Sequence, residues 1–443
     1  MQKIKSLNES SFLKLFFGFL SAAFLIAAVC MPDRANLFSG LWQIVSQPAK
    51  ISTNDFAVGG YAATFLNMGL VGAIFTVLFV ALNATANNVS TLAFILTLGF
   101  SSWGINVLNI WPTILGGVGY SLVRKEKLGA NINAMMFSTG IAPLISDLLV
   151  RYPNAEVVGF NLPGLLVTLV VGFLIGFLLP AGLGHAPAVH KGFDLYSAAV
   201  PVCFMAFFLN ATLYKSMGVD LPAAPDADTL QVASQATVNI FCCVVFGLCI
   251  LGALAMGCKP GDYVQLLGAP EHVVSISGKM GNPVFLMNVG VYGLFILAYY
   301  NLIGASFNAV TFGIIFCMLC TCNSGSLPGN VWPIMLGYVV ASTVFGWLSS
   351  LAGGNFTGAI NAQAIAVGLC FANGLSPISS KYGWFWGMVA AMMHYLLVTS
   401  VPNMHGGYCL YNGGFTAAVI CLLLVPQLER FVKTKAERKN AKV

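Results

Sequence analysis

The sequence predicts an all-α integral membrane protein made of two repeats of about seven helical segments, with the second repeat inverted and some helices interrupted or re-entrant. Scarce charge, long apolar runs and an internal duplication lead to this fold class. Of 443 residues, 58% are hydrophobic and only 8% are charged, whereas soluble domains carry about 25% charged residues. So few charges cannot cover a surface in water. The lipid bilayer of the cell (cytoplasmic) membrane is therefore the expected partner of most of this surface.

The apolar runs favour helices over a β-barrel. Residues 164–183 and 238–256 form long, continuous apolar stretches, whereas barrel strands alternate apolar and polar residues in short segments. About 20 apolar residues cross a bilayer as a helix. A backbone in lipid must also satisfy its own hydrogen bonds, so these runs are expected to be membrane-spanning helices.

A shift that places Asn109 on Asn330 reveals the duplication. It aligns NIWP at 109–112 with NVWP at 330–333, and NMGLVG at 67–72 with NVGVYG at 288–293. Matches of this kind in the same order are the signature of a repeated structural unit.

Two further blocks match after insertions. TGIAP at 139–143 resembles NGLSP at 373–377, and HKGFDLY at 190–196 resembles HGGYCLY at 405–411. The predicted organisation is a first transmembrane repeat at 1–232, a second at 233–427 and a basic cytoplasmic tail at 428–443.

Seven segments are expected in each repeat. Those of the first lie near 13–31, 61–83, 88–102, 105–123, 130–150, 163–183 and 194–214, and those of the second near 235–256, 282–301, 305–321, 327–349, 357–375, 382–400 and 409–427. The third and fifth of each repeat are short or interrupted by Gly, Asn and Pro, which is typical of half-helices or re-entrant segments.

Charge placement predicts the topology, because cytoplasmic loops of membrane proteins are rich in Lys and Arg. With both termini in the cytoplasm, the basic loops and the tail lie inside and the loop with Asp220 lies outside. Seven segments per repeat give fourteen crossings and inverted repeats. Were the fifth segments re-entrant, twelve crossings and parallel repeats would result.

Candidate site residues are those at which Pro, Gly or amides interrupt matching apolar segments of the two repeats, because such breaks line transporter sites. The candidates are Asn133, Thr139, Gly140, Pro143, Asn361, Gln363, Asn373, Gly374, Pro377, Asn67, Asn288, Asn109, Asn330 and His394. Each has a structural alternative. Asn109 and Asn330 can cap a helix, the amides near the breaks can join helices, and Asn67 and Asn288 can serve close packing. His394 can be a hydrogen-bonded core histidine, and Asp147 with Arg151 one turn on suggests a local ion pair.

The blocks NVWP at 330–333, Asn361 to Pro377, and HGGY at 405–408 resemble those of an uncharacterised bacterial membrane family, a domain of unknown function. This resemblance covers nearly the whole chain and implies no substrate. Residues 357–373 are also similar, in pattern only, to the pore helix of urea transporters. The count of segments is similar to that of nucleobase and sulfate carriers, whose intramembrane acidic residues are missing here.

Three hypotheses of function remain open. The first is a channel or facilitator for a small polar solute, the second a Na⁺- or H⁺-coupled secondary transporter, and the third a membrane scaffold or accessory subunit. No enzyme motif, cofactor fingerprint or metal-ligand spacing is present, so no enzyme activity, cofactor or metal is expected. The basic tail is interpreted as a membrane flank rather than a nucleic-acid contact, and a homo-oligomer is one possible assembly.

Overall fold

The computed structural model describes residues 7–153, 158–222, 235–269 and 272–440. Within these ranges the chain is helical and no strand is present. The first repeat contains α2 (Glu9–Cys30), α3 (Leu37–Val45), α4 (Asp55–Ala81), α5 (Asn88–Phe100), α6 (Trp111–Arg124), α7 (Ile132–Ser138), α8 (Ala142–Val150), α9 (Leu162–Leu183), α10 (Pro187–His190) and α11 (Ala199–Asn210). The second contains α12 (Gln235–Ala255), α13 (Pro260–Leu267), α14 (Ile276–Lys279), α15 (Asn282–Leu302), α16 (Ala309–Leu319), α17 (Pro328–Leu351), α18 (Gln363–Ala372), α19 (Ser376–Tyr382), α20 (Trp384–Val398) and α21 (Asn412–Phe431), followed by the tail helix α22 (Lys435–Asn440).

Asparagine starts several of these helices. The side chains of Asn8, Asn87, Asn161 and Asn308 each accept a hydrogen bond from the backbone N–H three residues further on, at 2.7–3.1 Å. Such caps satisfy amide groups that the first turn of a helix leaves free. The local sequence therefore fixes where these apolar runs become helical.

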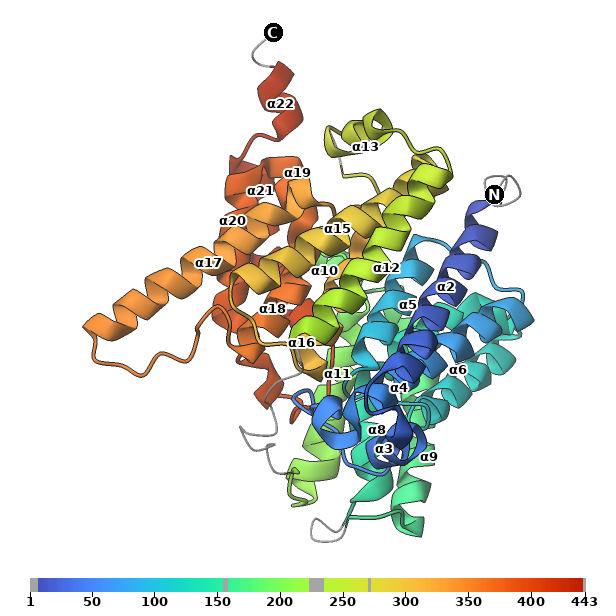
Figure 1. The fold of residues 1–443 in the computed structure, drawn as a ribbon. Helices are drawn as coiled ribbons and strands as arrows, with labels where there is room; N and C mark the ends of the chain where they lie inside the picture. Colours follow the sequence, from blue (N-terminus) through green and yellow to red (C-terminus); the bar gives the residue numbers. More distant parts are fainter. Residues whose placement is uncertain (1–6, 154–157, 223–234, 270–271, 441–443) are drawn as a thin grey trace.

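The two predicted repeats are confirmed, and the second is inverted. Ten helical stretches of the described residues are long and apolar enough to cross a membrane, so the chain is a multi-pass membrane protein. Helix α2 begins on the face of the molecule where α21 ends, whereas its counterpart α12 ends on that face, next to α13 (Figure 1). We call this face the terminal face, and the face with α3 and the start of α9 the opposite face.

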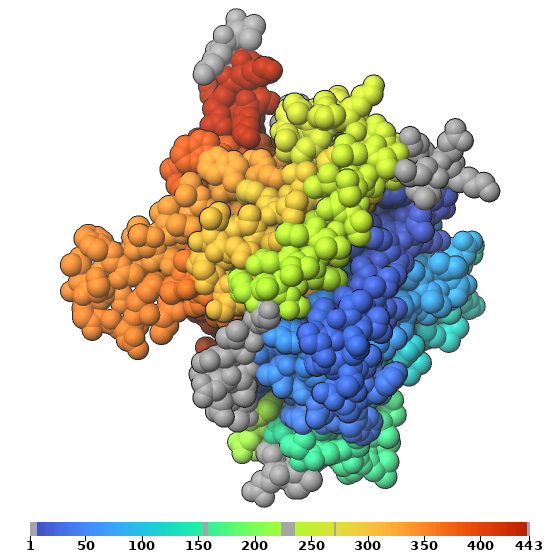
Figure 2. Space-filling view, in the orientation of Figure 1, coloured from blue at the N-terminus to red at the C-terminus, as the bar shows by residue number. Residues whose placement is uncertain are grey.

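The first helices of the repeats lie side by side. Figure 2 shows α2 and α12 adjacent on the surface, and an apolar groove of about 580 Å³ runs between them. Phe19, Ile26, Ile240 and Val244 line this groove. Its composition suits contact with lipid chains.

The third segments differ from full membrane crossings. Helices α5 and α16 have 13 and 11 residues, so they are about 20 and 17 Å long, shorter than the bilayer core of about 30 Å. They are buried and pack against each other so closely that a Cβ on Gly313 would lie 2.4 Å from the carbonyl oxygen of Gly99. They are half-helices, and the expected count of fourteen full crossings is too high because these two helices cannot span alone.

The fifth segments are interrupted as predicted. Helices α7 and α8 are separated by a 3-10 turn at Thr139–Ile141, and α18 and α19 by one at Asn373–Leu375. Pro143 and Pro377 occupy the first turns of α8 and α19, where proline costs no hydrogen bond. The breaks and both prolines are buried. The second fifth segment runs on to Tyr382, past the predicted end at 375, because Pro377 starts a helix rather than ending one.

Candidate functional site

The break in each repeat is covered by the loop before the last helix of the other repeat. The backbone N–H of Leu195 donates to the carbonyl of Gly374 at 3.1 Å, and that of Leu410 donates to the carbonyl of Gly140 at 2.9 Å. A Cβ at Gly374 would lie 2.5 Å from the ring of Tyr196 in this loop. The two duplicated sequence blocks therefore recur together because each packs on the other across the repeat interface.

The same contact holds in the first repeat, where a Cβ at Gly140 would lie 2.7 Å from the ring of Tyr411. Both glycines are thus required for close approach of an aromatic ring. Each break is thus in direct contact with a loop of the other repeat.

Asn373 is the centre of a buried polar network. Its Nδ2 lies 2.7 Å from the carbonyl oxygen of Met318, 2.9 Å from Thr321 Oγ1 and 3.0 Å from the hydroxyl of Tyr292. Its Oδ1 accepts from the hydroxyl of Tyr196 at 2.7 Å. Since all of these groups are fully buried, each depends on the others for its hydrogen bonds.

The first repeat lacks this network. The equivalent residue, Thr139, donates to the carbonyl of Met136 in its own helix at 2.6 Å. The hydroxyl of Tyr411 is buried and has no hydrogen-bond partner among the described residues. The two breaks therefore have the same backbone conformation but different polar contacts.

The other duplicated asparagines hold the loops that follow the half-helices. Asn67 Nδ2 donates to the carbonyls of Ser101 and Ile105 at 2.7 and 2.8 Å. Asn288 donates in the same way at 2.8 and 3.0 Å, to the equivalent residues of the second repeat, Cys322 and Ser326. Asn67 and Asn288 therefore hold the loops after the half-helices through hydrogen bonds, a role that differs from both solute contact and the close helix packing expected as its alternative.

Asn109 and Asn330 connect the same loops to the fifth segments. Asn109 Nδ2 lies 2.8 Å from the carbonyl of Gly104 and 2.9 Å from Ser146 Oγ, and Asn330 makes the equivalent contacts with Gly325 and Ser380 at 2.9 and 3.1 Å. Their amide oxygens accept from backbone N–H groups of their own turns.

The remaining candidates lie apart from the breaks. Asn361 is exposed, and Gln363, at the start of α18, accepts from Asn308 at 2.5 Å. His394 is buried between Tyr338 Oη at 2.7 Å and the carbonyl of Gly413 at 2.8 Å. Asn133 is half-buried, and its Oδ1 has no partner among the described residues. The structure thus brings together Thr139, Gly140, Pro143 and their counterparts, but not these four.

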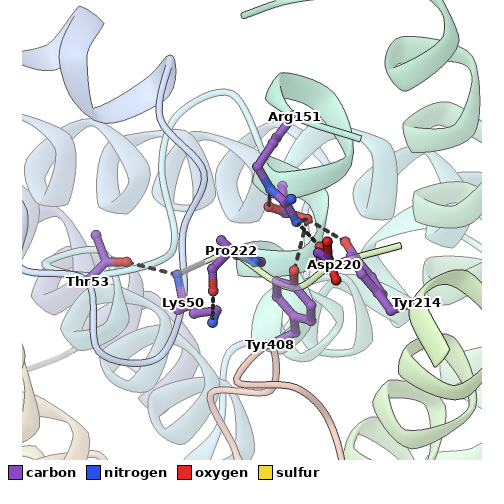
Figure 3. Close-up of polar contacts among 8 residues, drawn as sticks. Lys50, Thr53, Arg151, Tyr214, Asp220, Pro222 and Tyr408 are labelled. Atoms are coloured by element: carbon purple, nitrogen blue, oxygen red, sulfur yellow. Dashed lines mark hydrogen bonds and ion pairs between the residues drawn. The ribbon is translucent and has the colours of Figure 1, made fainter. Parts of the chain in front are cut away.

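A charged network closes the opposite face. Arg151 donates to both carboxylate oxygens of Asp147, at 2.7 and 2.9 Å, and both side chains are buried. The hydroxyls of Tyr214 and Tyr408 donate to Asp147 Oδ2 at 2.5 and 2.9 Å (Figure 3). Because Tyr408 belongs to the second repeat, this cluster joins the two repeats; we call it the Asp147 cluster.

Three loops pack over the Asp147 cluster. Arg151 donates to the carbonyl of Asp220 at 2.9 Å, and Lys50 donates to the carbonyl of Pro222 (Figure 3). The backbone N–H of Ile51 donates to the carbonyl of Gly407 at 2.9 Å. Burial lowers the pKa of Lys50 from its usual value, nearby Asp147 raises it and Arg151 lowers it. Among the described residues, loops of both repeats therefore meet over the Asp147 cluster and are joined by these hydrogen bonds.

The equivalent region of the terminal face is open. Aligning Pro143 with Pro377 places Asp147 on Lys381, and aligning His190 with His405 places Tyr408 on Phe193. Here a cavity of about 420 Å³ replaces the closed cluster. We call it the tail cavity; it is lined by Lys191, Gly192, Phe193, His272, Pro377, Lys381, Thr434, Lys435 and Ala436.

His272 separates the tail cavity from the loop between the second half-helix and α17. Its Nε2 lies 2.7 Å from the carbonyl of Ser324, and its Nδ1 lies 3.2 Å from Ser380 Oγ. Burial lowers the pKa of His272 to about 4, so the ring is neutral near pH 7, with Nε2 donating to the carbonyl and Nδ1 accepting from the hydroxyl.

Small hydroxyl side chains lie behind His272. Ser326 Oγ is 3.2 Å from Ser376 Oγ, both buried, and Ser380 also contacts Asn330. At the positions equivalent to Ser324, Ser326 and Ser376 the first repeat has Trp103, Ile105 and Ala142. Three of these four serines are thus specific to the second repeat, whereas Ser380 has a serine counterpart, Ser146, in the first. We call Ser324, Ser326, Ser376 and Ser380 the serine floor.

Sequence reasoning identified Asp147 and Arg151 only as a local pair and did not single out Lys381 or His272. The signal for Lys381 was present, because extending the alignment of the Pro143 and Pro377 blocks by four residues pairs it with Asp147. No local pattern marks His272. In the part of the chain that the structure describes, no group of three or more His, Cys, Asp or Glu side chains is placed to hold a metal ion.

Comparison with known proteins identifies one family. A family model described as a protein of unknown function, DUF1576, matches residues 33–215 and again residues 264–430, in agreement with the internal duplication. No curated protein and no solved structure matches the chain.

Proposed function

The chain belongs to the DUF1576 family of proteins of unknown function, and from that premise we propose that it carries a small polar solute across the membrane by alternate exposure of a site between its repeats. The unequal state of the two faces carries the proposal. The Asp147 cluster closes the opposite face, whereas the tail cavity opens the equivalent region of the terminal face. In an inverted repeat, an exchange of these two states between the repeats switches access from one side to the other.

The centre of the molecule favours a carrier over a permanently open channel. The half-helices α5 and α16 are in close contact at Gly99 and Gly313, and the Asn373 network fills the break next to them. A solute entering from the tail cavity would meet His272 first and the serine floor behind it. The serine hydroxyls can replace part of the hydration shell of a polar solute, as site groups do in channels and carriers.

Uptake into proteoliposomes tests this function. The purified protein is reconstituted and given a panel of labelled urea, glycerol, inorganic phosphate and small carboxylates, with and without Na⁺ and H⁺ gradients. We expect saturable uptake of at least one member. Uptake of none under any gradient would contradict transport and favour the scaffold hypothesis.

Removing one hydroxyl of the serine floor should slow uptake. Ser376→Ala is expected to lower the initial rate about 2- to 10-fold, because a neutral hydrogen bond contributes about 0.5–1.5 kcal/mol. Ser138→Ala is the matched control, since Ser138 is equally buried but bonds only within its own helix, to Met135 at 2.7 Å. Equal rates for the two variants would exclude the serine floor from the path.

A further inference from the structure

The tail cavity carries more positive charge than its surroundings neutralise. Among the described residues, Lys191 forms an ion pair with Glu429 at 2.6 Å. Lys381 and Lys435 also line the cavity, and no described carboxylate lies within 4.0 Å of either ammonium group. His272 adds no charge near pH 7, because burial keeps its pKa at about 4.

Lys381 is held at the cavity by aromatic rings. Its Nζ lies 5.0 Å from the ring centre of Phe193 and 5.5 Å from that of Tyr382, within the range of a cation–π contact. Such contacts fix an ammonium group in place but leave its three donors available to a ligand. The side chain is therefore held in position without an ion pair to a described carboxylate.

The tail is part of the cavity wall. Arg438 donates to the carbonyl of Tyr382 at 2.6 Å and so fixes α22 against the end of α19. Lys435 on the same helix lines the cavity. Burial, and after it the charge of Arg438, lowers the pKa of Lys435 from its usual value, so its ammonium group lacks part of its hydration.

The duplication supplies an internal comparison. Asp147, the equivalent of Lys381, is charge-compensated by Arg151 and accepts from two tyrosine hydroxyls. Lys381 occupies the same place in the fold but forms no ion pair within 4.0 Å with a described carboxylate, and a cavity of about 420 Å³ lies beside it. Glu437 on the tail helix interacts with it electrostatically beyond that distance. That volume is within the usual range for small-molecule sites.

We propose that the tail cavity binds an anionic phosphate or carboxylate group, held between Lys381 on α19 and Lys435 on the tail helix. This inference rests on the proposed function for its role: on that basis the anionic group belongs to the transported solute. The same chemistry is offered by the headgroup of an acidic phospholipid, and the experiment separates the two sources.

Equilibrium binding to the full-length protein tests the site. The purified protein in an uncharged detergent is titrated with inorganic phosphate at constant ionic strength, with chloride as the reference anion, and heat of binding and Tm are recorded. We expect saturable binding and a rise in Tm. The double variant Lys381→Gln/Lys435→Gln should weaken the affinity at least about tenfold, since charge-assisted hydrogen bonds contribute about 1.5–3 kcal/mol each.

The matched control is Lys127→Gln/Lys259→Gln, which removes the same charge from exposed lysines outside the cavity and should bind phosphate like the original chain. A second arm compares nanodiscs of phosphatidylcholine with and without phosphatidylglycerol. Stabilisation by phosphatidylglycerol but not by phosphate, lost only in the cavity variant, would support the site and assign it to a lipid headgroup.

No response to either anion, or equal responses in both double variants, would overturn the inference. The measurement uses no gradient and no transport. Anion binding without any uptake would therefore support the anion site and contradict only the proposed transport. Uptake of neutral solutes without anion binding would support transport and contradict only the anion site.

Discussion

Asp147→Asn is expected to destabilise the protein by about 3–5 kcal/mol, because it leaves the guanidinium of Arg151 buried without a counter-charge. Arg151 has only 4% of its side chain exposed and Asp147 none. The carboxylate also accepts from Tyr214 and Tyr408. The loss is measured as the shift in thermal and denaturant unfolding of the purified protein in detergent.

The double variant Asp147→Asn/Arg151→Met separates the pair from its surroundings. Removing both charges is expected to recover much of the stability, since replacing a whole buried ion pair costs far less than breaking it. Hydrogen exchange at residues 47–53 and 404–411 should rise in the single variant, because both loops pack over the Asp147 cluster. A loss below about 1 kcal/mol, typical of exposed ion pairs, would contradict this role.

Asn373→Leu is expected to lose about 2–4 kcal/mol of stability and to abolish uptake. It removes the four hydrogen bonds of the Asn373 amide, to Tyr196, Tyr292, Met318 and Thr321, and each buried hydrogen bond contributes about 0.5–1.5 kcal/mol. Thr321 still donates to the carbonyl of Met318 at 3.2 Å, which limits the loss. Tyr196 keeps its contacts with the carbonyls of Cys317 and Cys370, at 3.1 and 3.2 Å. Thermal unfolding and proteoliposome uptake measure the two effects.

Thr139→Val is the matched control for Asn373→Leu. It occupies the same position of the first repeat but loses only one hydrogen bond within its own helix, so its cost should be about 1 kcal/mol. Equal effects of the two variants on stability and uptake would mean that the Asn373 network contributes no more to stability or transport than the equivalent break of the first repeat.

The helices and the duplication follow from the sequence because their causes are local. Apolar runs, asparagine caps and matched blocks lie within a few residues of the features they determine, and the family match agrees with the repeat. Element ends were less predictable. Regular geometry in α4 begins only after Gly60 (φ +86°), where the carboxylate of Asp33 accepts from the N–H of Ala62 at 3.1 Å, a contact from 29 residues away.

The candidate site was only partly predictable, because its polar groups are satisfied by distant parts of the chain. Asn67 and Asn288 are amide side chains in apolar segments, as expected of site residues, but they donate hydrogen bonds to the loops after the half-helices. Asn361 is also an amide side chain next to an apolar segment, yet it is exposed. The covering of Gly374 by Tyr196, 178 residues earlier in the chain, depends on the exchange of loops between repeats, which no local pattern encodes.

The difference between the two faces could not be predicted from the sequence either. Asp147 and Lys381 are equivalent by alignment, but only the structure shows one compensated within a closed cluster and the other beside a cavity. Closure is a matter of how three loops pack, and loop packing is weakly determined by hydropathy. The serine floor could not be predicted for the same reason. Serine is a common residue, and these serines are recognised as a group only from their position behind His272 in the structure.

The central claim is that the opposite face opens when the terminal face closes. Spin labels at Val158 and Met404, exposed positions near the opposite face in different repeats, measure it after replacement of the exposed Cys30 and Cys243 by serine. In nanodiscs, electron spin resonance should give one main distance for the closed face and a second, longer distance that grows in Asp147→Asn and on addition of a transported solute. A single distance distribution, unchanged by the variant and by every solute that is taken up, would contradict alternating access.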